Sequence, residues 1–416
     1  MDHRKVRTIV QNNDASSLLT QNITLEQKDL KFMIKEYSTF VPSVPGSVEE
    51  EWNQCLKKLS LTCSRTHTPL KINVFTDQPD YASYLKLKKF IDRSVAETFG
   101  DKCPVITVLC QPPDKPWKII AEAGFIDTSS CEMVSKVLDT SHYVVRTTES
   151  MKEVWAGGLG ASLFPDDTRK AAVAAFEQMR SVLNAEQISF DHIVRQWNYI
   201  GNILEVKKEV QNYQKFNEVR SEYYHKYRNV HSYPAATGIG MKFGGVVLDF
   251  CAVKALANLK IIAVDNPDQI RPYDYSQQVL KGKPLCSKGI NQPPQFERAL
   301  FLTENMGSTL FISGTASIIG QDTIGIDDVE EQTIVTLDNI NKLTDSGRIS
   351  HLSGKPGSDA GSPILLRVYI KNQDDITKVK AICEQRYPGV PSVYIEADIC
   401  RDNLLVEIEA EFLIHN

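Results

Sequence analysis

Apolar and polar positions alternate in the same order in three separated segments of the chain. Residues 72–126, 195–253 and 365–414 each read as an apolar strand, an amphipathic helix, a proline and two further strands. One arrangement that recurs three times is typical of three copies of a single supersecondary unit. The pattern therefore predicts a chain built from three related parts.

A further helix is predicted ahead of the recurring segment in each part. Apolar residues fall at helical spacing in two of these helices, and acidic or hydroxyl residues that can cap a helix precede all three. The apolar positions are Trp52, Cys55, Leu56 and Leu59 in the first part, and Val173, Phe176, Met179 and Leu183 in the second. Ser47, the pair Asp166–Asp167 and the pair Asp327–Asp328 mark the predicted helix starts.

These patterns predict an α+β fold in which helices cover one face of a mixed or antiparallel sheet in each part. The predicted boundaries are a polar tail at 1–30 and three units at 31–130, 131–256 and 257–416. Three such units can close around a pseudo-threefold axis, so we expect a monomer that acts as a pseudo-trimer. A long insertion at 265–299 interrupts the third unit, and its aromatic residues favour a binding loop over disorder.

Charge and composition narrow the class of protein. The net charge of −5 gives no electrostatic footprint for nucleic acid, and no run of about 18 apolar residues predicts a membrane span. The first residues lack the apolar core of a secretion signal. Nine scattered cysteines and eight scattered histidines form no metal-ligand motif, so we expect reduced thiols, a cytoplasmic location and no cofactor.

One acidic residue distinguishes the third unit from the other two. The last strands of the units align on three acids, Glu122, Asp249 and Glu409. Two residues before these acids the first two units carry Ile120 and Val247, whereas the third carries Glu407. Burying a carboxyl in an apolar strand is costly unless it is paired or protonated. We therefore expect one catalytic cleft at Glu407 and two clefts that are filled or structural, the alternative being that this acid lies on a solvated sheet face.

The third unit resembles the Rid/YjgF family. The resemblance lies in the FISGTAS strand and turn at 311–317, the Q…L.NI helix pattern and the terminal strand VEIEA at 406–410. The resemblance implies trimer-like clefts, imine or enamine hydrolysis, and a water-positioning role for the first glutamate of VEIEA, which is Glu407. Pro391 is followed by Ser392 and Val393 where that family carries a carboxylate-binding arginine, which disfavours imine hydrolysis.

Most of the chain beyond residue 60 resembles the chorismatase family more narrowly. The motifs are RQWNYI at 195–200, YQKFNEVRSEYY at 213–224, PAATGIG at 234–240, DNPDQIRPYDY at 265–275, QFERAL at 295–300, SGTAS at 313–317 and ADICRDNLLVEIE at 397–409. Gln321 stands where a histidine is expected. The resemblance implies an enzyme built from Rid-like units that removes the enolpyruvyl group of chorismate as pyruvate. The alternatives are a Rid-type imine or enamine deaminase and a non-catalytic small-molecule-binding protein.

Glu407 is the predicted catalytic acid, because a carboxyl whose pKa is raised by an apolar pocket can protonate an enol ether. Cys400 is predicted beside it as the second catalytic residue, and Cys400 and Ala316 are expected to steer the choice between a hydroxybenzoate and a dihydroxycyclohexadiene product. Arginines suit the carboxylates of chorismate or a similar small molecule. The predicted substrate-binding residues are Arg195, Asn198, Tyr199, Arg220, Thr237, Tyr273, Arg298, Ala316 and Glu409.

Overall fold

The computed structural model describes residues 36–229, 232–281, 283–284, 289–304 and 307–414. Residues 32–416 form one compact unit, and the following description concerns the described residues of that unit. The predicted polar tail at 1–30 lies outside the described residues.

The first sheet has four strands in the order β1-β4-β2-β3. They are β1 (Glu36–Phe40), β2 (His67–Thr76), β3 (Val105–Leu109) and β4 (Ile119–Asp127). Strands β2 and β3 pair in parallel, and the other neighbours are antiparallel. Helices α2 (Val48–Thr62) and α3 (Tyr81–Phe99) pack their apolar residues on one face of this sheet, and Ser47 caps α2 in a capping box. A single 3₁₀ turn, η2 (Gly100–Lys102), follows α3.

The second sheet has six strands in the order β11-β8-β12-β7-β6-β5. They are β5 (Glu132–Leu138), β6 (Ser141–Thr147), β7 (Met151–Leu159), β8 (Ile193–Gly201), β11 (Ala235–Met241) and β12 (Val246–Ala255). Helices α4 (Thr168–Ala185) and α5 (Asn212–Tyr227) cover one face of it. The 3₁₀ turn η3 (Phe190–His192) and the short hairpin β9 (Val206–Lys207) and β10 (Val210–Gln211) complete this part.

The third sheet also has six strands, in the order β13-β14-β15-β20-β18-β19. They are β13 (Lys260–Val264), β14 (Ala299–Glu304), β15 (Gly307–Ala316), β18 (Leu365–Ile370), β19 (Ser392–Glu396) and β20 (Val406–Ile414). Helices α6 (Val329–Leu343), α7 (Ser346–Ser353) and α8 (Ile376–Arg386) contribute to its outer core. The remaining pieces are β16 (Ile318–Ile319), β17 (Asp322–Thr323), η4 (Pro272–Asp274), η5 (Gln277–Val279) and η6 (Gln373–Asp375).

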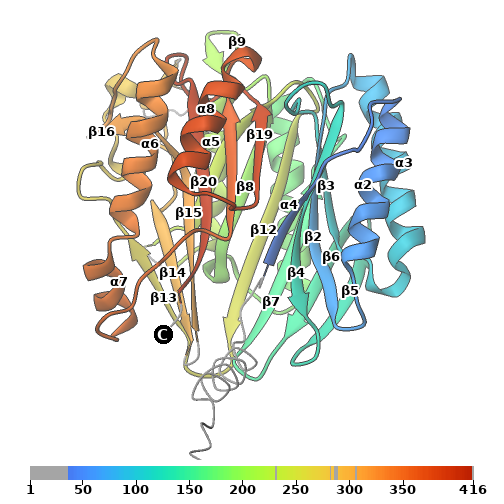
Figure 1. Cartoon of the computed structure of the whole chain (residues 1–416). Helices are drawn as coiled ribbons and strands as arrows, with labels where there is room; N and C mark the ends of the chain where they lie inside the picture. The colour runs from blue at the N-terminus through green and yellow to red at the C-terminus, as the bar shows by residue number, and fades with distance from the viewer. Residues whose placement is uncertain (1–35, 230–231, 282, 285–288, 305–306, 415–416) are drawn as a thin grey trace, which may run out of the picture. The chain divides into compact units, whose positions relative to one another are not determined.

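The predicted α+β class is confirmed, with strands on the inside and helices on the outside of the three sheets (Figure 1). The predicted starts of two helices are also confirmed, since Asp167 caps α4 and Asp328 caps α6. The inner faces of the sheets share one hydrophobic core, to which Phe75, Trp155, Trp197, Phe311 and Tyr369 belong. No helix among the described residues is long and apolar enough to span a membrane.

The three sheets share one register at their centres. In each sheet a strand pairs in parallel with the strand that follows the helix and antiparallel with the last strand. The central partners are Asn73 with Glu122, Trp197 with Asp249, and Arg367 with Glu409. Two residues before these acids stand Ile120, Val247 and Glu407, each opposite an aromatic residue. This register matches the alignment made from the sequence.

Candidate active site

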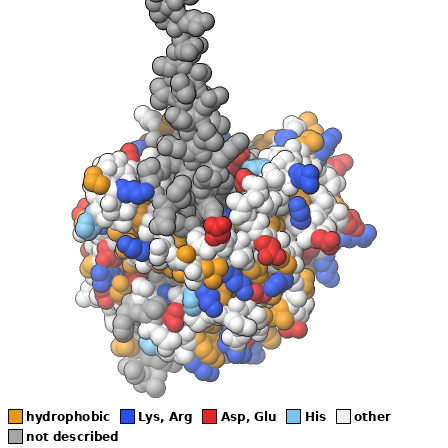
Figure 2. Space-filling view, turned by 90° about the horizontal axis from the view of Figure 1, so that it is seen from below, with side chains coloured by type: hydrophobic (Ala, Val, Ile, Leu, Met, Phe, Trp, Pro, Cys, Tyr) orange, Lys and Arg blue, Asp and Glu red, His pale blue; other side chains and the backbone are white. Residues whose placement is uncertain are grey.

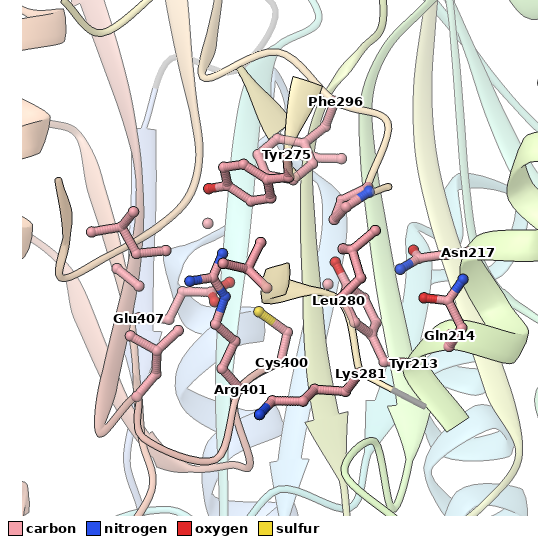
Figure 3. A pocket seen from close by; sticks show the side chains of 18 of the residues that line it. Tyr213, Gln214, Asn217, Tyr275, Leu280, Lys281, Phe296, Cys400, Arg401 and Glu407 are labelled. Atoms are coloured by element: carbon pink, nitrogen blue, oxygen red, sulfur yellow. The ribbon is translucent and has the colours of Figure 1, made fainter. Parts of the chain in front are cut away.

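A cavity lies between the second and third sheets, around Glu407 (Figure 3). Strands β11, β15 and β20, helix α5 and the loop before β14 supply its walls. Its lining residues are Gln211, Tyr213, Gln214, Asn217, Ala236, Gly238, Tyr275, Val279, Leu280, Lys281, Pro294, Phe296, Arg298, Gly314, Ala316, Ile318, Cys400, Arg401, Leu404 and Glu407. Four predicted site residues therefore meet in one cavity, namely Glu407, Cys400, Arg298 and Ala316.

Glu407 is held in its place by the neighbouring strands. It lies on β20 opposite Ala316 of β15 and Tyr369 of β18, and only 4% of it is exposed. Its carboxyl group makes no hydrogen bond to the described residues. A Cβ atom added to Gly314 would clash with the Glu407 Oε1 atom, so β15 can carry only a glycine there without displacing the carboxyl group.

The surroundings of Glu407 favour its protonated form. Burial raises its pKa to about 8, and the negative charge of nearby Glu409 adds to the effect. Arg195 and Arg298 oppose this rise without cancelling it. At neutral pH the cavity therefore holds a neutral carboxylic acid, which can give up a proton to a bound molecule.

Two guanidinium groups lie close to one aromatic ring in this cavity. Arg298 donates from Nη2 to the Tyr275 hydroxyl at 2.6 Å and to the Ile270 carbonyl at 2.7 Å. Arg401 donates from Nη1 to the Gln321 carbonyl at 2.7 Å, and its Cζ lies 5.1 Å from the centre of the Tyr275 ring. The Nε of Arg298 has no partner among the described residues. Both arginines thus keep donors for an anionic ligand.

The opposite wall is polar and comes from α5. Figure 3 shows Tyr213, Gln214 and Asn217 together on this side, across from Arg401, Cys400 and Glu407. Arg220 donates to the side-chain oxygen of Asn217 at 2.7 Å, while the Asn217 amide nitrogen is buried without a partner among the described residues. This wall therefore offers an amide donor that a ligand oxygen could satisfy.

The thiol of Cys400 lines the cavity as a neutral group. Burial raises its pKa to about 12, and the charge of Glu407 contributes in the same direction. Since the thiolate is the reactive form of cysteine, Cys400 can shape the cavity but is poorly suited to act as a nucleophile.

Gln321 lies at the edge of the cavity. Its side-chain oxygen accepts a hydrogen bond from the Ser276 backbone at 3.0 Å, next to Tyr275, and its own carbonyl accepts from Arg401. The residue that departs from the chorismatase motif thus holds two elements of the cavity wall in place.

Three of the predicted substrate-binding residues take part in buried pairing instead of lining the cavity. Arg195 donates to the Glu409 carboxylate at 2.8 Å and to the Thr237 hydroxyl at 2.7 Å, and Thr237 also bonds Glu409. Burial alone would raise the pKa of Glu409, but Arg195 and Arg367 outweigh burial and hold that pKa below its usual range. Glu409 is therefore the anionic neighbour that helps keep Glu407 protonated.

The other predicted contacts lie further from the cavity. The Asn198 amide donates to the Thr237 carbonyl at 2.9 Å, and Tyr199 is fully buried in the shared core. Arg220 is buried behind Asn217, and the Tyr273 hydroxyl bonds Glu297 at 3.4 Å. None of these four lines the cavity.

A buried polar ring connects the three sheets beneath the cavity. Lys71 and Thr107 of the first sheet donate to Asp249 of the second, at 2.6 and 2.9 Å. Arg195, Trp197 and Thr237 of the second sheet donate to Glu409 of the third. Arg367 of the third sheet donates two hydrogen bonds of 2.6 Å to Glu122 of the first and another to Glu409. Each sheet therefore donates to the next, and the last donates back to the first.

The sequence prediction missed Tyr213, Gln214, Asn217, Lys281 and Arg401 as cavity residues. The sequence signal that could have revealed the residues of α5 is its composition, because many of the residues that this helix buries are polar. The aromatic insertion was predicted to bind, but Tyr275 and not Tyr273 reaches the cavity. Within the described residues, no group of three or more His, Cys, Asp or Glu side chains is arranged to hold a metal ion.

Part of the sequence matches a family model, and the fold matches a solved structure. Residues 144–252 match the family model "Chorismatase FkbO/Hyg5-like, N-terminal". A crystal structure of a chorismatase superposes with a TM-score of 0.64 at 20% identity, covering 92% of this chain and 100% of that one. The resemblance to the chorismatase family predicted from the motifs is thereby confirmed.

Two proteins of Streptomyces hygroscopicus are similar in sequence. One is a 3-hydroxybenzoate synthase, 29% identical over 253 residues, which are 59% of this chain and 69% of that protein. The other is a chorismatase, 28% identical over 269 residues, which are 64% of this chain and 70% of that protein.

Proposed function

We propose that this protein is a chorismate-converting enzyme that removes the enolpyruvyl group as pyruvate. The observation that carries the proposal is a neutral, buried Glu407 carboxyl in a cavity that also holds two arginines. Similarity to a chorismatase and a 3-hydroxybenzoate synthase supports the choice of substrate. A molecule with two carboxylates and an enol ether requires this combination of fixed cations and a proton donor.

The reaction needs one proton transfer and one nucleophile. Glu407 gives its proton to the methylene carbon of the enol ether, which leaves a cation at the ether carbon and a Glu407 carboxylate. Water captures the cation, returns a proton to Glu407, and the adduct collapses to pyruvate and a dihydroxycyclohexadiene carboxylate. If a substrate hydroxyl captures the cation instead, elimination of pyruvate can end in an aromatic hydroxybenzoate.

The cavity residues have separate roles in this scheme. Arg298 and Arg401 bind the substrate carboxylates, and the Asn217 amide donates to a ring oxygen. Ala316 and Cys400 set the space in which water competes with the substrate hydroxyl. Of the other residues predicted from the sequence, Arg195, Thr237 and Glu409 position and polarise Glu407, whereas Asn198, Tyr199, Arg220 and Tyr273 support the walls.

We also propose that the three sheets are Rid-like units, at 31–130, 131–256 and 257–416, arranged about a pseudo-threefold axis in a single chain. The shared register of the three central strand pairs supports this arrangement. The buried ring supports it too, because its donors point from each sheet to the next in one direction. On this proposal the chain needs no partner subunit to complete the cleft at Glu407.

A Rid-type imine deaminase is the second candidate. Register makes Thr237 of β11 the equivalent of Val393 of β19, since each lies opposite the central residue of its sheet. The cleft at Glu407 therefore has Thr237, and not arginine, near the position where the Rid family binds a carboxylate. Arg298 and Arg401 reach this cleft from other elements, which favours the chorismate substrate.

One assay separates the three candidates. The purified chain is incubated with chorismate, and separately with an enamine generated in the assay, while pyruvate and ammonia are both measured. Pyruvate from chorismate in equal amount with a ring product supports the proposal. Ammonia release from the enamine alone would indicate a deaminase, and no turnover of either compound would leave a non-catalytic binding protein.

A further inference from the structure

A second cavity lies where the shared register places the counterpart of the Glu407 cleft. It separates β19 of the third sheet from β1 and β4 of the first. Ser392, Tyr394 and Ile120 line it, and their register equivalents Ala236, Gly238 and Glu407 line the active cleft. The cleft at Ile120, which we expected to be filled or structural, is therefore an open cavity and is not filled.

This second cavity lacks the proton donor of the first. Ile120 stands where the active cleft has Glu407, and Tyr394 stands where it has Gly238, so an apolar and an aromatic side chain replace the acid and the glycine. Trp117 and Val393 add to the apolar surface. Such a cavity is suited to hold the apolar body of a ligand without reacting with it.

Charged side chains that form no ion pair within the described part of the chain line the rim of this cavity. Lys380 and Glu384 lie one turn apart on α8, and Asp114 stands on the loop before β4. None of the three makes a side-chain hydrogen bond or ion pair with the described residues. A lysine four residues before a glutamate is the weaker order for a helical ion pair, which leaves both groups available to a ligand.

A buried phenol supplies a further polar contact. Tyr394 is 7% exposed, its hydroxyl lies near the Ser392 side chain, and it makes no well-aligned hydrogen bond to the described residues. The Lys380 ammonium lies 5.7 Å from the centre of the Tyr394 ring, so cation and aromatic surface adjoin each other. Buried polar groups of this kind normally have a partner, which a bound molecule would provide.

We propose that the cleft formed by Trp117, Ile120, Lys380, Glu384 and Tyr394 binds an α-amino acid with an aromatic side chain. The carboxylate of the amino acid pairs with Lys380, its ammonium group pairs with Glu384 and Asp114, and its ring packs on Trp117 and Ile120. The neighbouring opposite charges of a zwitterion match the two partners on α8. This second site goes beyond the proposed chorismate reaction and does not depend on it.

Calorimetric titration of the full chain tests the proposal, with L-phenylalanine, L-tyrosine and L-tryptophan as probes. Saturable binding at one site is expected for at least one of them. Alanine keeps the zwitterion without the ring, 3-phenylpropanoate lacks the ammonium group and phenethylamine lacks the carboxylate. Each of these should bind at least about tenfold more weakly, because each loses one of the three contacts.

Variants locate the binding site. Lys380→Gln and Glu384→Gln should each weaken binding by about tenfold or more. Lys378→Gln should not, since Lys378 lies on the same helix but near Glu330, at 3.9 Å. Glu407→Gln should also leave binding unchanged, which separates this test from the fate of the chorismate proposal. Thermal melts would establish that every variant is folded.

Three outcomes would overturn the proposal. One is the absence of saturable binding for all three aromatic amino acids. Another is full binding by both α8 variants while they remain folded. The third is loss of binding in Glu407→Gln, which would place the amino acid in the active cleft instead.

Discussion

The protonation state of a single residue, Glu407, determines the pH range in which the cleft can deliver a proton. Burial raises the pKa of its carboxyl to about 8, so the acid form predominates at neutral pH and disappears above that value. We expect kcat/KM for pyruvate release to fall about tenfold per pH unit above pH 8. Initial rates from about pH 6 to about pH 10 would measure this profile, and a rate that rises steadily across the range would argue for Glu407 as a base.

Arg298 is the residue whose loss should weaken substrate binding most directly. A charge-assisted contact to a carboxylate contributes on the order of 1.5–3 kcal/mol, so Arg298→Ala should lower kcat/KM by about tenfold to a hundredfold. This loss should appear mainly as an increase in KM, with kcat little changed. Because Arg298 also bonds Tyr275 and the Ile270 carbonyl, circular dichroism must accompany the kinetics.

Arg271→Ala is the matched control for this variant. Arg271 lies in the same insertion, but its partner is Asp265 on the surface and half of its side chain is exposed. Its removal should leave KM unchanged. Equal effects of the two substitutions would show that charge near the loop, and not a contact in the cavity, determines binding.

Among the secondary-structure elements, strand β15 leaves space for the Glu407 carboxyl group because it carries a glycine, Gly314, beside it. A Cβ at Gly314 would overlap the Glu407 carboxyl, and both groups lie between paired strands that cannot easily separate. Gly314→Ala should therefore reduce turnover by about tenfold or more while the fold survives, since a small displacement of a catalytic group is costly. Gly347→Ala, in the exposed first turn of α7, should leave the rate unchanged. A fully active Gly314→Ala would mean that Glu407 can move freely.

The elements themselves differ in how well the sequence predicts them. Helices with a capping residue and a regular apolar stripe, such as α2 and α4, could be placed because both signals are local. Strand β5 was missed because its residues are largely exposed and show no apolar alternation. Strand β14 was missed because it directly follows the long insertion, where no turn residue separates loop from strand.

In the molecule as a whole, the buried polar ring links the three sheets to one another. Arg367 is fully buried and contacts carboxylates of two sheets, so its removal leaves Glu122 without its paired arginine and Glu409 with Arg195 alone. Breaking a buried pair in this way costs about 3–5 kcal/mol. We expect Arg367→Met to lower the free energy of unfolding by that amount, as measured in urea.

Arg386→Met provides the comparison, because Arg386 pairs with Asp338 near the surface. Exposed pairs contribute about 0–1 kcal/mol, so this variant should be nearly as stable as the wild type. If the two substitutions destabilise the protein equally, the ring does not hold the sheets together.

The part of the site that depends on strand register could be predicted from the sequence. The part that depends on how the sheets pack against one another could not. Glu407 follows from comparing three aligned strands, and Arg298 and Cys400 lie in motifs shared with chorismatases. Arg195 and Glu409 lie in the same motifs, yet they pair with each other, and a motif alone does not separate contact from support. Arg401 and Asn217 come together only because the second sheet packs against the third.

The most direct test of Glu407 as the proton donor compares Glu407→Gln with Glu411→Gln in the chorismate assay for pyruvate. Both glutamates lie on β20, both are buried, and burial raises the pKa of Glu411 to about 7. Only Glu407 lines the cavity. We predict that Glu407→Gln lowers pyruvate release by about two to four powers of ten, while Glu411→Gln stays within a few-fold of the wild type. Pyruvate release by Glu407→Gln at the rate of the wild type, with chorismate consumed, would contradict the central role of Glu407.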